Sequence, residues 1–65
     1  MKRYKIESFV VTDEWKQKNA DKCQLEGWTE FFTEDIVNEL YKRGCEIKQV
    51  IKIGGNFCTV MYTED

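Results

Sequence analysis

The feature that most constrains this fold is a glycine turn between two segments of strand-forming residues. Residues 46–53 and 57–63 are rich in β-branched and aromatic side chains, which favour β-strands. Between them lies Gly54-Gly55-Asn56, three residues that tolerate the positive φ of a tight turn. The pattern predicts an antiparallel hairpin that turns at Gly54-Gly55. Alternation in the first strand predicts two faces. The face that packs on the helix consists of Ile47, Ile51 and Ile53. The outward face consists of Lys48, Val50 and Lys52.

The segment before the hairpin predicts the main helix, over residues 33–43. Thr33 is a suitable N-cap, and Glu34 and Asp35 follow it in the first turn, where the helix dipole favours negative charge. Gly44 lies where a chain commonly leaves a helix with positive φ. The apolar residues of this segment share one stripe at helical spacing: Ile36, Val37, Leu40 and Tyr41. We expect this stripe to form the core together with the isoleucine face of the hairpin.

The first half of the chain has a less regular pattern. Residues 3–11 predict a strand, and its end at Phe9-Val10-Val11 is apolar on both faces. This indicates either a bulge or an end that is covered on both sides. Residues 12–28 predict a short helix with Thr12 as its cap, within a longer excursion. The alternative is that residues 25–32 form a second strand.

These elements predict an α+β fold in the order β-(α)-α-β-β. The simplest arrangement is a three-stranded antiparallel sheet with one main helix packed on one face, and the first strand could lie beside either of the others. At 65 residues we expect a single domain, residues 1–65. Because a lone core of this size is marginal, we expect a homodimer, formed through an open sheet edge or through the apolar end of the first strand.

The composition argues against an enzyme or a metalloprotein. The chain has no histidine, and its three cysteines, Cys23, Cys45 and Cys58, are widely spaced. They predict free thiols in a reducing cytoplasm and no disulfide framework or zinc site. Cys45 follows Lys42 and Arg43, but the C-terminal end of a helix disfavours a thiolate. We therefore expect no catalytic residue, no metal and no cofactor.

Charge and hydropathy narrow the range of partners. The chain carries 10 basic and 12 acidic residues, a formal charge of −2, which does not favour nucleic-acid binding through bulk electrostatics. No apolar run approaches the ~18 residues that a membrane span needs, and the basic N-terminus is not followed by the apolar segment of a signal peptide. We expect a cytoplasmic protein that does not enter a membrane.

Aromatic and apolar residues that the regular elements leave unexplained are the candidates for a partner site. Aromatic residues make up 14% of the chain, and tryptophans are frequent binding hot spots. The alternative for Trp15 and Trp28 is that they close over the core. Glu30 and Phe31 belong to an acidic, aromatic cluster that suits a basic protein partner. The candidate partner-binding residues are Trp15, Trp28, Phe9, Val11, Glu30, Phe31 and Val50.

The C-terminal half also resembles very small accessory proteins of spore-forming Gram-positive bacteria and their phages, among them a sporulation protein. The resemblance is carried by Val37-Asn38-Glu39-Leu40, by Ile47 through Ile53 and by Thr59-Val60-Met61-Tyr62, and residues 12–28 depart from it. It implies a short accessory protein without assigning an activity.

The combined pattern favours a small non-enzymatic binding protein, encoded by a phage or prophage, that inhibits or modulates a host protein by surface binding. The alternative is a sponge for a small molecule such as a nucleotide signal, with its pocket at a homo-oligomer interface. Basic and aromatic side chains are available there to hold a phosphate and stack a base.

Overall fold

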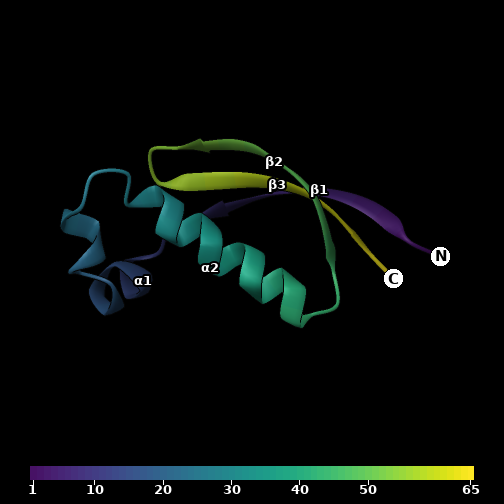
Figure 1. Cartoon of the computed structure of the whole chain (residues 1–65), viewed down its shortest axis with the longest axis horizontal. Coiled ribbons are helices and arrows are strands. Elements are labelled where there is room, and N and C mark those ends of the chain that lie inside the picture. The colour runs from purple at the N-terminus through teal and green to yellow at the C-terminus, as the bar shows by residue number, and fades with distance from the viewer.

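The computed structural model describes all of residues 1–65 and shows a three-stranded antiparallel sheet with one long helix across one face (Figure 1). The elements are β1 (Arg3–Val10), α1 (Asp13–Lys18), the 3-10 turn η1 (Lys22–Gln24), α2 (Thr29–Lys42), β2 (Glu46–Gly54) and β3 (Phe57–Glu64). The strand order is β1-β3-β2, so the C-terminal strand is central and both other strands are edges. The predicted α+β fold is confirmed, and the first strand lies beside the third.

The main helix begins earlier than predicted. α2 starts at Thr29 with Trp28 as its N-cap, not at Thr33. Thr33 is instead buried within the helix, and its hydroxyl donates to the Thr29 carbonyl at 3.0 Å. Phe32 explains the difference, because extending the helix through it places its ring in the core, where it is 5% exposed. Burial of a large aromatic ring outweighed the capping preference of a threonine.

The helix ends as predicted, at Gly44. This glycine has a φ of +82°, and the Cys45 N–H donates to the Leu40 carbonyl at 3.0 Å while the Gly44 N–H donates to the Tyr41 carbonyl at 3.0 Å. These two bonds form a Schellman motif, which satisfies the last carbonyls of the helix and reverses the chain toward β2.

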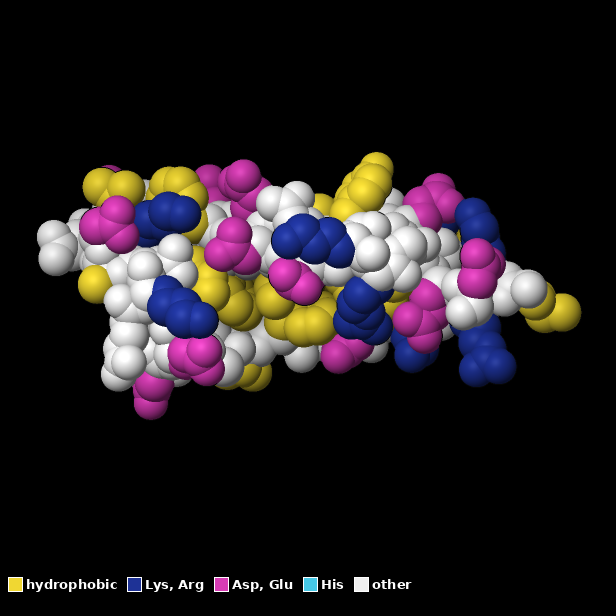
Figure 2. Space-filling view, turned by 90° about the horizontal axis from the view of Figure 1, so that it is seen from below, with side chains coloured by type: hydrophobic (Ala, Val, Ile, Leu, Met, Phe, Trp, Pro, Cys, Tyr) yellow, Lys and Arg dark blue, Asp and Glu magenta, His cyan; other side chains and the backbone are white.

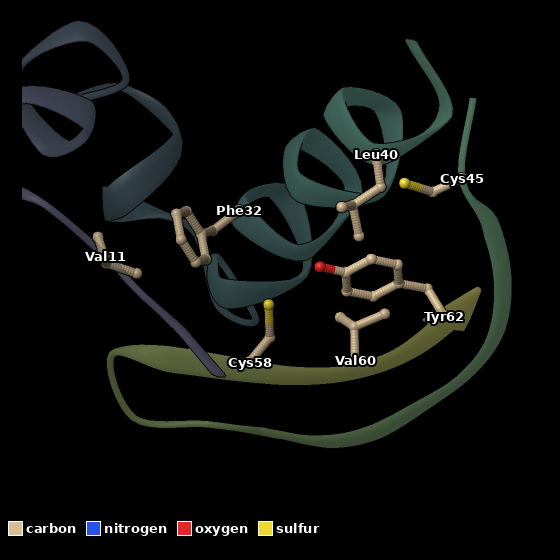
Figure 3. Packing of buried hydrophobic residues seen from close by; sticks show 7 residues of the cluster. All are labelled: Val11, Phe32, Leu40, Cys45, Cys58, Val60 and Tyr62. Atoms are coloured by element: carbon tan, nitrogen blue, oxygen red, sulfur yellow. The ribbon is translucent and has the colours of Figure 1, made fainter. Parts of the chain in front are cut away.

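The core lies between α2 and the central strand. Cys58, Val60 and Tyr62 of β3 are fully buried beneath Phe32 and Leu40 of α2, and Val11 and Cys45 complete the cluster (Figure 3). The helix stripe therefore runs through residues 32, 36 and 40 at intervals of four. Tyr41, predicted to belong to it, is 69% exposed.

The hairpin forms as predicted, but its faces differ from the prediction. The turn lies at Gly55-Asn56, one residue later than expected. β2 shifts register twice, between Ile47 and Gln49 and between Val50 and Lys52. Each irregularity adds a residue and interrupts the alternation.

The consequence is that every third residue of β2 shares the helix-side face. Ile47 lies opposite Tyr62, Val50 opposite Val60 and Ile53 opposite Cys58. The prediction that Val50 points outward with Lys48 and Lys52 is therefore wrong. Ile53 lies on the helix-side face as predicted, but it is 47% exposed, and the prediction that Ile51 packs beneath the helix is wrong, since it is 46% exposed.

β1 is regular to its end. Its register with β3 is unbroken from Arg3 to Val10, so neither the predicted bulge nor the two-sided cover occurs. Phe9 lies on the helix side, Val10 is 65% exposed, and Val11 enters the core after the strand has ended. The apolar run thus provides the last two residues of β1, Phe9 and Val10, and then a core residue, Val11.

The excursion between β1 and α2 contains the predicted short helix. Thr12 caps α1, because its Oγ1 accepts a hydrogen bond from the Trp15 N–H at 3.1 Å. The alternative strand over residues 25–32 is wrong: a turn with Gly27 at a φ of +74° leads directly into α2.

Candidate binding surface

The sheet has one face that no other element covers. α2 and the excursion lie on one side of the sheet, and the other side is bare (Figure 1). We call this side the uncovered face. The strand register assigns to it Tyr4, Ile6, Ser8 and Val10 of β1, Phe57, Thr59, Met61 and Thr63 of β3, and Glu46, Gln49 and Lys52 of β2.

The uncovered face carries no charge over two of its three strands, and its apolar side chains lie on either side of the hydrogen-bonded hydroxyls of Ser8 and Thr59. None of the eight residues from β1 and β3 carries a charge. Tyr4 is 72% exposed, Ile6 66% and Val10 65%, and Phe57 and Met61 of the central strand are half-buried beside them. Exposed apolar side chains gathered on one face of a small protein are typical of an interaction site.

Charged side chains border this patch on the β2 side. Lys2 reaches across the sheet to Glu46, with 3.1 Å between Nζ and Oε2, and Glu46 also accepts from Lys48 at 2.9 Å. Beneath this bridge Thr63 is buried, and its Oγ1 has no hydrogen-bond partner. At the other end, the Lys52 ammonium lies 5.1 Å from the centroid of the Phe57 ring.

The opposite side of the molecule has a different character. Figure 2 shows acidic and basic side chains interspersed over the helix side, with hydrophobic side chains visible between them. A mixed surface of this kind is typical of solvent-facing helices. The helix side therefore differs from the β1 and β3 residues of the uncovered face in carrying charges of both signs.

Four of the predicted site residues belong to the core or pack directly on it. Val11 is buried in the cluster, and Phe9, Trp15 and Trp28 pack against it. The Trp15 ring meets Phe32 edge to face, with 5.3 Å between centroids, and lies 6.1 Å from Trp28. The Trp15 Nε1–H donates to Asp35 Oδ2 at 2.8 Å. The two tryptophans thus close the end of the core, as their alternative interpretation proposed.

The other three predicted site residues lie on α2 and β2. Glu30 is exposed in the first turn of α2, and its neighbour Phe31 is half-buried with the Lys22 ammonium 5.6 Å from its centroid. Val50 lies opposite Val60 on the helix side of β2, so none of the three lies on the uncovered face. A role for them in binding stays a prediction.

Sequence reasoning missed the uncovered face although its signal was present. Tyr4 and Ile6 alternate with Lys5 and Glu7, and the usual inference is that the apolar pair faces the core. In the structure the charged pair lies on the helix side, beyond the edge of α2, because Phe9 has the same parity and joins the core.

Two polar contacts hold that charged side of β1. The Tyr62 hydroxyl donates to Glu7 Oε1 at 2.7 Å, and this bond to a carboxylate, together with burial, raises the pKa of Tyr62 to about 12. Lys5 Nζ lies 2.6 Å from Glu64 Oε1, and its hydrogen bond lowers the pKa of Glu64.

The cysteines, the acidic residues and the surface hollow can each be placed in the structure. The three cysteines are free, and burial raises the pKa of the Cys58 thiol, which disfavours the reactive thiolate. No three residues of the kinds that ligate metals come together. A shallow hollow of ≈ 210 Å³ lies beside α1, lined by Thr12, Glu14, Trp15 and Lys18. None of the helices has the length and apolar character needed to cross a membrane.

Comparison of the chain with protein-family models, with curated proteins and with solved structures finds no match. The resemblance of the C-terminal half to small phage and sporulation proteins therefore stays a hypothesis, and the uncovered face is the observation from which function can be argued.

Proposed function

We propose that this protein is a small non-enzymatic binding protein that docks its uncovered face onto another protein and modulates it. The observation that supports the proposal is the row of exposed apolar side chains on β1, Tyr4, Ile6 and Val10, next to half-buried Phe57 and Met61. The resemblance supports a phage or prophage origin, and with it a host protein in the cytoplasm as the partner.

The size and shape of the molecule support the same proposal. A folded monomer of 7.8 kDa exposes about 4,400 Å², whereas this chain exposes 4795 Å². Its radius of gyration is 12.4 Å, against about 11 Å for a compact chain of this length. The molecule measures 41 × 20 × 15 Å, which corresponds to one helix layer on one sheet layer. A third layer, supplied by a partner, would cover the face that is bare.

The face also suggests the chemistry of the partner. Its centre is uncharged, so the partner should present apolar side chains there, as in the core of most interfaces. Glu46 and Lys52 at the border suit a rim of mixed charge. Hot-spot energetics predict that a few central residues carry most of the affinity, and Met61 is central because it belongs to the middle strand.

The proposal is tested by capture of a partner with matched variants. Immobilised protein is exposed to a lysate of a spore-forming Gram-positive bacterium, alongside Met61→Lys on the uncovered face and Tyr41→Lys on the outer side of α2. We expect a host protein to be retained by the native chain and by Tyr41→Lys, and to be lost with Met61→Lys. Retention that is unchanged in Met61→Lys, or no retained protein at all, would contradict the proposal.

The small-molecule sponge stays the alternative. The hollow beside α1 is smaller than the ~300–1,000 Å³ of most ligand pockets, so this alternative depends on a pocket between copies. Thermal shift against a panel of nucleotides tests it, since a ligand at 100 times its Kd adds about 2.7 kcal/mol to stability. A flat response across the panel would remove it.

A further inference from the structure

The two edges of the sheet differ in how well they are protected against pairing with another strand. Both edges carry basic side chains, Arg3 and Lys5 on β1 and Lys48 and Lys52 on β2, but only β2 is interrupted in its register, and it is interrupted twice. Bulges and lysines are the usual devices that keep an edge strand from adding a further strand. β1 has neither interruption, and its eight residues run in unbroken register with β3.

β1 is also free of cover along its outer edge. Its extensive contacts are with β3 alone, while α2 packs over β2 and β3. All of residues 3–8 are exposed. A strand that is held on one side only and exposed on both faces is a ready acceptor for another strand.

The backbone groups available at this edge can be assigned. The Val11 N–H donates to the Asn56 carbonyl at 2.7 Å, so this residue is directed toward the β3 side. In an antiparallel ladder the direction alternates from residue to residue. Because the register is unbroken, the N–H and C=O groups that point away from β3 are those of Tyr4, Ile6, Ser8 and Val10.

Charge selects one register for a second copy. A two-fold axis normal to the sheet pairs residues of the same face, and only the registers centred on Ile6 and on Glu7 pair all but one residue of β1. The register centred on Glu7 sets that carboxylate against itself, and like charges directly opposite one another are destabilising. The register centred on Ile6 sets each Lys5 opposite Glu7 of the second copy.

The same register matches the free hydrogen-bonding groups. Ile6 lies opposite Ile6 of the second copy, and Tyr4 lies opposite Ser8, so every opposed pair among these residues consists of outward-directed groups. The Lys5–Glu7 contacts would also join two existing ones, since Lys5 already bonds Glu64 and Glu7 already accepts from Tyr62. α2 makes its extensive contacts with β2 and β3 and none with β1, so it packs away from this edge.

We propose that the partner of the β1 edge is a second copy of this chain, paired antiparallel about Ile6 to give a continuous six-stranded sheet with both helices on one side. The dimer brings the two uncovered faces side by side and so doubles the apolar surface. It does not depend on the proposed function, because the edge can pair whether or not the face binds a partner.

The test is sedimentation of two charge-reversed variants, alone and mixed. Lys5→Glu alone sets carboxylates opposite carboxylates, and Glu7→Lys alone sets ammonium groups opposite ammonium groups. We expect the native chain to sediment as a dimer at high micromolar concentration and each variant to dissociate at least about tenfold more readily. An equimolar mixture restores both opposed pairs, so we expect it to regain the dimer.

The outcomes separate the alternatives. Native protein that stays monomeric, or single variants that dimerise as the native chain does, would overturn the proposal. If the dimer survives both charge reversals but is lost in the Met61→Lys variant, the two copies pair through the uncovered face and not through the edge. A mixture that fails to recover the dimer, although each variant melts cooperatively, also counts against the register.

A backbone test is independent of charge. Ile6→Pro removes an outward N–H that β3 does not use, which edge strands tolerate, so circular dichroism should show a folded chain that sediments as a monomer. Glu7→Pro is the matched control, because its N–H points toward β3 and its loss should lower the melting temperature further. A folded Ile6→Pro that remains dimeric would rule out pairing through this edge.

Discussion

The two faces of the central strand differ in how far the rest of the chain buries them. Cys58, Val60 and Tyr62 have no exposed surface, because α2 lies over them. Phe57 and Met61, one residue away in each case, retain part of theirs. Since residues on the two faces alternate within the same eight-residue strand, the difference comes from the elements that pack on it and not from strand propensity.

The chain therefore covers only one of the two faces of its sheet. The helix-side face has a complete core, with the two tryptophans packed at one end of α2 and the turn at Gly44 at the other, whereas the uncovered face has β-forming side chains and no layer packed on them. The first face should therefore be sensitive to substitution in the isolated chain, and the second should matter only when a partner is present.

The largest expected effect is a truncation beneath the helix. Leu40→Ala should lower the free energy of unfolding by about 2–5 kcal/mol, because it leaves a cavity against β3. Ile6→Ala on the uncovered face removes an aliphatic group that is 66% exposed and should change stability by no more than about 0.5 kcal/mol. Urea unfolding of both variants makes the comparison, and equal losses would mean that the uncovered face is packed in the monomer.

The next effect concerns the turn that returns the chain to the sheet. Gly44 has a φ of +82°, so Gly44→Ala should cost about 1–2 kcal/mol through the left-handed conformation alone. Gly54 is the matched control, since its φ is not positive and a Cβ there meets no atom within 4 Å. If thermal melts show the same loss for Gly44→Ala and Gly54→Ala, conformational strain is not the cause.

Much of the helix-side face could be predicted from sequence. The helix, its end at Gly44 and the hairpin follow from local rules, because φ preference and apolar periodicity act within a few residues. The start of α2 could not be predicted, since it depends on Phe32 reaching a core that strands distant in sequence complete. The faces of β2 could not either, because two register shifts place Ile47, Val50 and Ile53 together, and the break in alternation at Val50 does not show where they occur.

The uncovered face was harder to predict for a related reason. Alternation shows which residues of β1 share a side, but not which side the helix occupies. Phe9 decides this, because it lies opposite Cys58 beneath the cluster, and through it Lys5 and Glu7 are placed on the helix side. That assignment depends on pairing with a strand some 50 residues away in sequence, which no local pattern encodes.

A smaller effect should come from the border of the uncovered face. Thr63 is 3% exposed and its hydroxyl has no partner, and a buried unsatisfied polar group is destabilising. Thr63→Val keeps the shape, removes that group and favours the strand, so it should raise the free energy of unfolding by about 1 kcal/mol. Thr59→Val is the control, because its hydroxyl lies 2.8 Å from that of Ser8. If chemical denaturation shows Thr63→Val to be less stable, the hydroxyl is satisfied in solution.

A further effect appears only at alkaline pH and involves the contact between β1 and the core residue Tyr62. Hydrogen bonding of the neutral Tyr62 hydroxyl to Glu7 raises the pKa of Tyr62 to about 12, above the ordinary value of about 10 in the unfolded chain. Because the folded state holds this proton more tightly, the stability that it contributes is complete below pH 10 and is lost as the pH rises toward 12.

Absorbance of the phenolate should show one of the three tyrosines ionising last, and Tyr62→Phe should abolish that step. Glu7→Ala should move it back toward pH 10, because the carboxylate acceptor is its largest cause. An unchanged titration in Glu7→Ala would mean that burial beneath α2 alone raises the pKa of Tyr62, and that Glu7 of β1 does not contribute to it.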